Sequence, residues 1–416
     1  MKKLLCILFA ALLLCACTLK PTHVETPADG PIETSQPVPD VPVPEITGYA
    51  GFADVLAAGL LLGDGNSNLS PISVYLALAM TAEGAEGETQ TAMLKLLGCS
   101  TVEELRAVCK SMLETLSIDA EDSTLALANS IWTADRNGTL TFRENYLKAL
   151  GEIYRSEANA VDFTKSETAK RIADWITENT RGKIKLSEDA MRFDAETLAV
   201  LINTVYLKDA WSDVFYESAT APDTFYAPDG EMTADYMNRK DDNVKIVKGD
   251  GFLRYSLPLL RVGRMTFVLP DEGTSLKDLL GTPEKLHRLL SDGEELRANV
   301  SVKLPKFKFQ SRFDLNDTLK TLGIGIAFDD RADFSGMCDA PACISQVLQE
   351  SFIGVDEKGV EAAAYTMVAM NEMCALDPEK LPEIEFHLTR PFLYAIESRD
   401  GTVLFLGTVT SPAFGE

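Results

Sequence analysis

The hydrophobic pattern divides the chain into a helical first half and a strand-rich second half. Apolar residues at three- and four-residue spacing predict helices over 71–83, 88–97, 102–116, 142–150 and 166–180, with one strand over 124–132. Longer apolar runs predict buried strands over 198–208, 265–269, 300–309, 344–355, 392–397 and 403–409. Many strands after many helices, without regular alternation, favour an α+β fold in one large domain over residues 48–416.

The first seventeen residues have the pattern of an export signal. Lys2 and Lys3 precede an apolar run from Leu4 to Ala16, which is shorter than the ~20 residues that a membrane-spanning helix needs. This predicts a cleaved signal peptide over residues 1–16. The sequence Leu-Cys-Ala-Cys at 14–17 resembles the lipobox of bacterial lipoproteins, which implies that Cys17 becomes the first mature residue and carries lipid. A simple secretion signal is the alternative.

Residues 17–47 have the composition of a disordered stalk. Seven prolines fall between Pro21 and Pro44, and no aromatic residue occurs from Thr18 to Gly48. Such a segment cannot bury enough apolar surface to offset its ordering entropy, and proline keeps it extended. With the lipid, it predicts an exported protein anchored at the outer face of a bacterial membrane, or else extracellular.

Composition and charge exclude several function classes. Lys and Arg total 39 against 63 Asp and Glu, a net charge of −24, so nucleic acid is not an expected partner. Only three histidines occur, and no GxSxG or HExxH motif is present. After Cys17, none of the cysteines forms a CxxC pair, which predicts neither a zinc site nor a disulfide framework, although Cys338 and Cys343 are close in sequence. We expect no cofactor, no metal and no enzymatic activity.

Several short motifs, in a fixed order, resemble the serpin family along nearly all of residues 49–416. They are NLSPIS at 68–73, NTVYLK at 203–208 followed by Trp211, VKLPKF at 302–307, LGI at 322–324, DFSG at 333–336, VDEKGVEAAA at 355–364, RPF at 390–392 and LFLG at 404–407. The resemblance implies three β-sheets, about eight or nine helices and an exposed reactive-centre loop at about 357–382.

The resemblance also implies a function. Serpins are suicide-substrate inhibitors of serine proteases and sometimes of cysteine proteases. The protease cleaves the loop, forms an acyl-enzyme and is trapped when the cleaved loop inserts into the large sheet as a new strand. We therefore expect a monomer whose partner is a covalently trapped protease. The alternative is a non-inhibitory serpin that acts as a binding or chaperone module.

The hinge of the loop has the alternation that insertion requires. Side chains of a strand point alternately to its two faces. One face would carry Val360, Ala362, Ala364 and Thr366, and the other Glu361, Ala363, Tyr365 and Met367. The first set can enter a closed sheet without a buried charge, and Gly359 supplies backbone freedom at the turn. Val360 replaces the Thr or Ser that is usual in the family.

The reactive bond is placed by counting from the hinge. Taking Gly359 as the first of fifteen residues, as the family pattern implies, puts Met373 before the bond and Cys374 after it. Methionine fits medium-sized apolar pockets, which indicates elastase-like or chymotrypsin-like enzymes. Leu376 and Lys380 are secondary candidates.

The resemblance also implies a gate under the opening of the sheet. Ser70, Ser73 and Asn203 match its polar residues, with Gln349 where the family often has histidine, and Trp211 matches the aromatic residue at the loop's entry. Ordinary roles, namely helix capping by Ser70, a buried amide for Asn203 and core packing for Trp211, are compatible with this interpretation.

Overall fold

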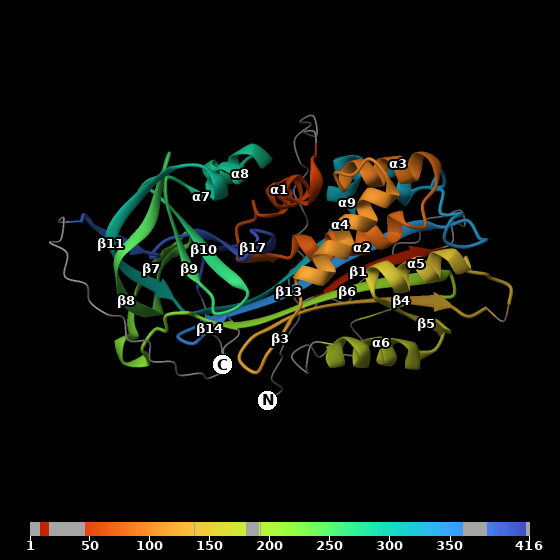
Figure 1. Ribbon diagram of the computed structural model, residues 1–416, viewed down its shortest axis with the longest axis horizontal. Helices are drawn as coiled ribbons and strands as arrows, with labels where there is room; N and C mark the ends of the chain where they lie inside the picture. Colours follow the sequence, from red (N-terminus) through yellow and green to blue (C-terminus); the bar gives the residue numbers. More distant parts are fainter. Residues whose placement is uncertain are drawn as a thin grey trace.

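The computed structural model describes residues 9–15, 46–136, 138–179, 191, 193–360 and 381–412. Its strands form two hydrogen-bonded networks, of eight and nine strands, and helices α2 to α6, between residues 71 and 179, pack against the first of these (Figure 1). The arrangement is the α+β fold that the order of helices and strands predicts. No helix of the described residues is long and apolar enough to cross a membrane.

The first network is the large sheet. Its strands are β1 (Phe9–Cys15), β3 (Ile118–Asp119), β4 (Thr124–Ala134), β5 (Ser156–Val161), β6 (Thr197–Ala210), β12 (Phe307–Asp314), β13 (Cys343–Asp356) and β14 (Gly359–Val360). Strands β6 and β13 do not adjoin one another, because β14 and β1 lie between them, each antiparallel to both. We call the space between β6 and β13 the insertion slot. Both neighbours of the slot are held from outside, β6 by β4 and β13 by β12.

The second network contains nine strands. They are β2 (Ser67–Leu69), β7 (Ala221–Ala227), β8 (Gly230–Gly249), β9 (Phe252–Pro258), β10 (Gly263–Pro270), β11 (Glu294–Pro305), β15 (Glu383–His387), β16 (Phe392–Ser398) and β17 (Val403–Val409). The long strand β8 pairs with β7, β11 and β9 along successive parts of its length. Because β8 is shared, layers that the family resemblance counts as separate sheets are continuous in hydrogen bonding here.

The helices cover the large sheet on both faces (Figure 1). The described residues form α1 (Gly48–Leu60), α2 (Pro71–Ala82), α3 (Gly87–Leu96), α4 (Val102–Thr115), α5 (Glu144–Tyr154), α6 (Ser166–Asn179), α7 (Leu276–Leu280), α8 (Pro283–Ser291) and α9 (Asn316–Leu319). Helices α2 to α5 lie over one face, and α6 lies against the other. Every residue of α2 is buried, which explains why its apolar pattern runs all round the helix.

One predicted strand, 300–309, is two strands in different networks. Strand β11 ends at Pro305, whose nitrogen cannot donate, and the amide of Lys306 instead bonds the carbonyl of Asp235 at 2.8 Å. From Phe307 the chain continues as β12, paired with β13. The aromatic ring of Phe307 packs against those of Phe392 and Tyr394. The run resembles one strand because buried apolar residues (Val300, Val302, Leu304 and Phe307) continue across Lys306.

Two further findings differ from the sequence analysis. Ser70 precedes α2, but its hydroxyl does not cap the helix and instead donates to the carbonyl of Leu404 at 3.0 Å. Part of the expected signal peptide, Phe9–Cys15, is a strand of the large sheet. The chain's apolar leader therefore forms backbone hydrogen bonds inside the fold.

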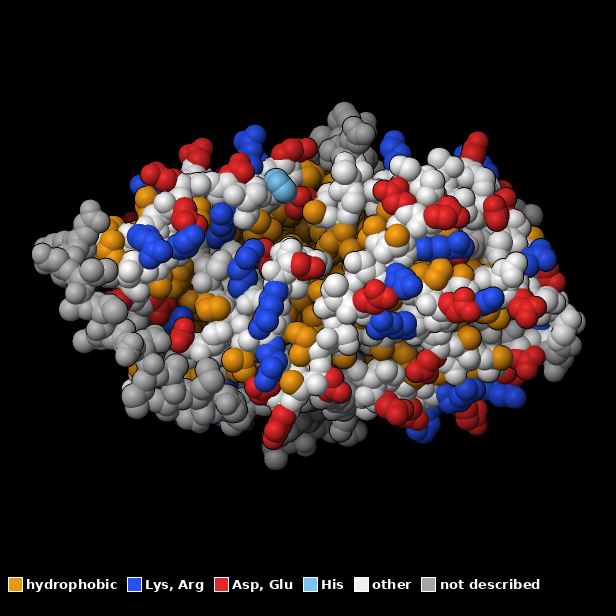
Figure 2. Space-filling view, viewed as in Figure 1, with side chains coloured by type: hydrophobic (Ala, Val, Ile, Leu, Met, Phe, Trp, Pro, Cys, Tyr) orange, Lys and Arg blue, Asp and Glu red, His pale blue; other side chains and the backbone are white. Residues whose placement is uncertain are grey.

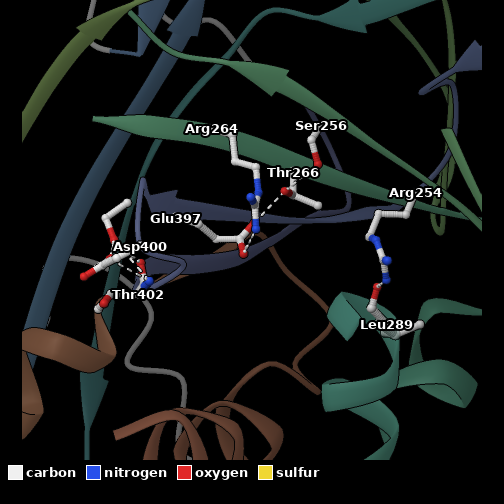
Figure 3. Close-up of polar contacts among 9 residues, drawn as sticks. Arg254, Ser256, Arg264, Thr266, Leu289, Glu397, Asp400 and Thr402 are labelled. Carbon is white, nitrogen blue, oxygen red and sulfur yellow. Dashed lines mark hydrogen bonds and ion pairs between the residues drawn. The ribbon is translucent and has the colours of Figure 1, made fainter. Parts of the chain in front are cut away.

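The surface in Figure 2 carries mixed charges, with a short row of Lys and Arg over the region of β9 and β10. Two arginines of these strands have internal acceptors. Arg254 donates to the carbonyl oxygens of Leu289 and Asp292 at 2.7 and 2.9 Å. Arg264 makes a two-pronged contact with Glu397 at 2.7 and 2.9 Å (Figure 3). Both arginines are engaged by their own fold.

Glu397 is buried, and its carboxylate has a second residue as a hydrogen-bond donor. The hydroxyl of Thr266 donates to the same carboxylate at 2.6 Å and is itself in contact with the hydroxyl of Ser256 at 2.8 Å. The hydrogen bonds that Arg264 donates to Glu397 raise the pKa of Arg264 above its usual value. The network joins β9, β10 and β16 across three neighbouring strands.

Replacing Arg264 with Met should destabilise the protein, because it leaves the buried Glu397 carboxylate without its cation. We expect a loss of about 1–2 kcal/mol in the free energy of unfolding at pH 7, measured by urea denaturation. The double variant Arg264→Met/Glu397→Gln should recover part of this loss. Arg331→Met, which removes an exposed arginine paired with Asp329, is the control and should not move the midpoint. An equal effect of both single variants would contradict the role given to burial.

Candidate functional site

The site lies where β13 turns into β14. This is the end of the insertion slot beside Asp356 of β13 and Ala210 of β6, which we call its upper end. Val355 and Asp356 of β13 pair with Val360 and Gly359 of β14. The same two residues of β14 pair on their other side with Asp209 and Ala210 of β6. The hinge that the sequence places at Gly359 is therefore already the beginning of a strand inside the large sheet.

The turn before β14 is fixed by contacts from two directions. The side chain of Asp356 accepts a hydrogen bond from the amide of Lys358 at 2.9 Å. The indole nitrogen of Trp211 donates to the carbonyl of Asp356 at 2.9 Å, and its amide donates to the carbonyl of Lys358 at 3.1 Å. Trp211, expected at the loop's entry, lies there and holds the turn through its backbone as well as its ring.

Glu357 is a buried acid within this turn, and only 7% of its surface is exposed. Its carboxylate lies 3.0 Å from the ammonium of Lys306 and accepts a hydrogen bond from Thr220 at 2.8 Å. Burial by itself would raise the pKa of Glu357. Hydrogen bonds from the backbone and Thr220, together with the Lys306 cation, outweigh it, so that the pKa lies below its usual value.

Gly359 is required by the close approach of two backbones. Its φ is +153°, and a Cβ at this position would lie 2.2 Å from the carbonyl oxygen of Asp209. No other residue can pair there without separating β14 from β6. The next residue, Val360, is 4% exposed. The hinge can enter the slot because Gly359 is followed by a small apolar residue, Val360.

A small, mostly apolar cavity begins directly beyond Val360. It is lined by Leu207, Phe352, Ile353, Gly354, Val360, Ile396 and Phe405. These residues come from β6, β13 and β14 on the sheet and from β16 and β17 behind it. The cavity therefore follows the slot in the direction in which β14 points.

Four buried polar residues, Ser70, Ser73, Asn203 and Gln349, form what we call the polar gate cluster. Gln349 donates through its side-chain nitrogen to the carbonyl of Ser70 at 2.7 Å. Asn203 donates to the side-chain oxygen of Asn129 at 2.9 Å. The side-chain oxygens of Asn203 and Gln349 and the hydroxyl of Ser73 have no hydrogen-bond partner among the described residues. The structure thus joins Ser70 directly to Gln349, and links Asn203 to β4 instead.

Comparison with known proteins identifies the architecture around this site. The family model "Serpin (serine protease inhibitor)" matches residues 51–412. Serpin-Z1C of Triticum aestivum is 32% identical over 367 residues, covering 83% of this chain and 90% of the wheat protein. The crystal structure of the thermophilic serpin tengpin in its native state has a TM-score of 0.75 at 29% identity, covering 88% of this chain and 94% of tengpin.

The chain belongs to the serpin family. Serpins are in general protease inhibitors and not catalytic enzymes. The fold extends to more distant members. Human thyroxine-binding globulin, in complex with its hormone, has a TM-score of 0.73 at 22% identity, covering 89% of this chain and 98% of the globulin.

Several predicted site residues of this serpin lie outside the described residues. They are the hinge residues Glu361, Ala362, Ala363, Ala364 and Thr366, the reactive bond Met373–Cys374 with its alternatives Leu376 and Lys380, and the lipidation site Cys17. The described part of the hinge is Gly359 and Val360.

The described histidines contact neighbouring polar side chains, and Cys338 is not in a disulfide. His287 lies 2.9 Å from the carboxylate of Asp54, and His387 lies 3.3 Å from the hydroxyl of Ser301. The carboxylate of Glu385 is 3.7 Å from His387, too far for the hydrogen bond that would orient a catalytic histidine. Cys338 is a buried, unbridged thiol, so the bridge to Cys343 that their spacing allowed is not formed. The described residues contain no cluster able to hold a metal ion.

The sequence analysis missed the residues that hold the turn from below. In the sequence, Lys306 stands out only as part of a family motif, and Thr220 and Asp209 do not stand out at all. Asp209 is buried and accepts hydrogen bonds from the amides of Arg261 and Val262 at 2.9 and 2.6 Å. The position of Glu357 in the sequence does indicate that a cation lies near it. An acid placed between two apolar strands needs a cation nearby, although the sequence does not say which one.

The pKa of Glu357 predicts how the stability of this turn depends on pH. Because the folded pKa is lowered from its ordinary 4.5, the stabilisation is complete above that value and is lost as pH falls through the folded pKa. Glu357→Gln should therefore cost roughly 1–3 kcal/mol at pH 7 and progressively less as the pH falls below the ordinary glutamate pKa of 4.5.

Urea denaturation of both proteins across this pH range is the measurement. The substitution also relieves Asp356, whose pKa is raised by burial and by the neighbouring charge, which makes the net loss smaller than the ion pair alone would give. Glu231→Gln, at an exposed position of β8, is the matched control. A difference between wild type and Glu357→Gln that grows on acidification would reverse the assigned sign.

Proposed function

We propose that this serpin is a suicide-substrate inhibitor of elastase-like or chymotrypsin-like serine proteases. The observation that carries the proposal is the hinge. Gly359 and Val360 pair with β13 on one side and β6 on the other, and an apolar cavity continues the slot beyond them. Loop insertion would extend β14, which is already paired with β13 and β6, so the register of the inserted strand is set before insertion begins.

The register of β14 assigns a place to each following residue of the loop. If insertion continues it, Ala362 reaches Ile353 and Leu207, and Ala364 reaches Ser351 and Val205, all of which are buried. Small alanine side chains suit the face of the sheet on which these buried residues lie. Glu361 falls on the alternate face, so that the loop's charge does not enter the core.

Thr366 has a specific place in the same register. It would lie opposite Gln349 and Asn203, whose side-chain oxygens lack hydrogen-bond donors among the described residues. A threonine hydroxyl is a donor that can reach an acceptor beside it on either strand. Insertion would therefore satisfy a buried acceptor of the polar gate cluster, which is a source of free energy for the inserted state.

The proposed reaction uses the protease's chemistry and the serpin's sheet. The serine hydroxyl of the protease attacks the carbonyl carbon of Met373, the Met373–Cys374 bond breaks, and Cys374 leaves with a new amino terminus. The acyl-enzyme ester on Met373 is then carried away as residues 361 onward enter the slot. A cysteine protease that attacks the same bond would be trapped as a thioester in the same way.

Export and membrane anchoring belong to the proposal as well. Removal of residues 1–16 and lipidation of Cys17 would leave residues 17–47 as an extended stalk between the membrane and the folded domain. A monomer on such a stalk can meet soluble proteases at the outer face of the membrane.

The alternative is a non-inhibitory serpin that binds a ligand or acts as a chaperone. The fold of thyroxine-binding globulin shows that a ligand carrier can share this architecture. The hinge favours inhibition, because Gly359 and Val360 enter the slot without a charge or a proline. Incubation with an elastase-like protease separates the two functions. An inhibitor gives a covalent complex that survives SDS, whereas a carrier is only clipped.

Val360→Arg should convert the inhibitor into a substrate. The guanidinium would have to enter an apolar cavity between β6 and β13 with no acid among the cavity's lining residues. We expect at least about a ten-fold fall in covalent complex per cleavage, measured by gel densitometry after reaction with the protease. Val360→Thr keeps the branched shape and should retain complex formation. If Val360→Arg traps protease at the wild-type ratio, the register given to β14 is wrong.

The position of the reactive bond predicts the peptide released from the complex. Cleavage after Met373 gives a carboxyl-terminal fragment that begins at Cys374, and mass spectrometry of the denatured complex measures it. Met373→Arg should weaken inhibition of elastase-like enzymes and create inhibition of trypsin-like ones, because the specificity pocket of the latter needs a cation. A fragment that begins at Asp377 or at Leu381 would move the bond to Leu376 or to Lys380.

A further inference from the structure

Strand β1 occupies the lower part of the insertion slot. Its residues Phe9 to Leu13 pair with 350 to 346 of β13, and Ala10 to Leu14 pair with 203 to 199 of β6. The strand is antiparallel to both neighbours, which is also the direction of β14 (Figure 1). Between the end of β14 and the beginning of β1, positions 351 to 354 of β13 have no partner on this side among the described residues.

The leader and the loop compete for the same backbone positions. Continuing the register of β14 places residue 365 opposite Glu350 and residue 366 opposite both Gln349 and Asn203. Strand β1 puts Phe9 and Ala10 at these same positions. Two strands cannot pair with one edge at the same place, so the loop cannot pass position 364 while β1 is present.

The leader's sequence is suited to this position. Residues 9–15 read FAALLLC, with no charged or strongly polar side chain, which suits a strand in the middle of a sheet. Leu12 shares its register position with Val347 and Leu201, both of which are buried. At the polar gate cluster the leader supplies Ala10, which has no hydroxyl for the unpaired oxygens of Asn203 and Gln349. The loop would supply Thr366 there.

We propose that the uncleaved leader is the occupant of the insertion slot and keeps the precursor from trapping proteases. The cut expected before Cys17 lies just beyond Cys15, the last residue of β1, so processing would remove the whole strand and empty the slot. The inhibitor becomes competent only when its leader has been removed. The consequence for inhibition rests on the function proposed above, whereas the place of the leader does not.

The place of the leader is tested by cross-linking in the full chain. Cys15 lies directly opposite Cys343 in the register of β1 and β13, a spacing that suits a disulfide. The Cys17→Ala chain keeps its leader, since the acceptor cysteine is gone. Mild oxidation should link Cys15 to Cys343, as mapped by peptide mass spectrometry, and the further substitution Cys15→Ser should abolish the link. Linkage of Cys15 mainly to other cysteines, or no linkage, would overturn the proposal.

The block is tested in the same Cys17→Ala background with a second substitution. Leu12→Asp puts a charge at a buried register position and should expel β1. Leu5→Asp makes the same change in the leader outside β1 and is the matched control. We expect Leu12→Asp to lose the cross-link and to raise the yield of SDS-stable protease complex by about ten-fold or more, whereas Leu5→Asp should change neither. Thermal melts confirm that both chains are folded.

The outcomes separate the two claims. Equal complex formation by the parent chain and by Leu12→Asp overturns the block. A Leu12→Asp chain that loses the cross-link and is still only clipped overturns the inhibitory function, while the loss of the cross-link supports the assignment of β1 to the slot.

Discussion

The structure depends on one constraint, the pair of facing strand edges presented by β6 and β13. Both strands run in the same direction and are held from outside by β4 and β12, and the two strands that lie between them, β14 and β1, are antiparallel to both. The backbone groups along these edges lie in the interior, where unpaired donors and acceptors are costly. Whatever fills the slot therefore decides the state of the molecule. The hinge fills its upper end and the leader its lower part, with a cavity between them.

The polar gate cluster makes the centre of the slot sensitive to its occupant. Asn203 and Gln349 each use their nitrogen as a donor, to Asn129 and to the carbonyl of Ser70, and their buried side-chain oxygens have no donor in the part of the chain that the structure describes. A fully apolar interior would accept any apolar strand equally well. A buried acceptor instead favours the strand that brings a hydroxyl. At this register position β1 carries Ala10, which cannot donate to the buried oxygens, whereas the inserted loop would carry Thr366, which can.

Much of the fold could be predicted from residue patterns, because burial repeats along each element. Helix α2 begins at Pro71 as its pattern predicts, and β13 spans the predicted 344–355 almost to the residue. The division of 300–309 at Lys306 could not be predicted, since both halves carry buried apolar residues and only the partner strands differ. The partners of Glu357, namely Lys306 and Thr220, come from distant parts of the chain. Strand β1 lay in a segment whose apolar run has an equally good explanation as an export signal.

The upper end of the slot explains why insertion would keep a single register. Asp209 is buried, accepts hydrogen bonds from Ser123 and from the amides of Arg261 and Val262, and pairs through its own backbone with Val360. Gly359 fits against the same residue so closely that a methyl group would collide with its carbonyl. Since the start of the strand is fixed at this point, the side chains of later loop residues would alternate between the two faces of the sheet, counted from Val360. A slip by one residue would bury Glu361 and expose the alanines, and the contacts of Asp209 are what oppose it.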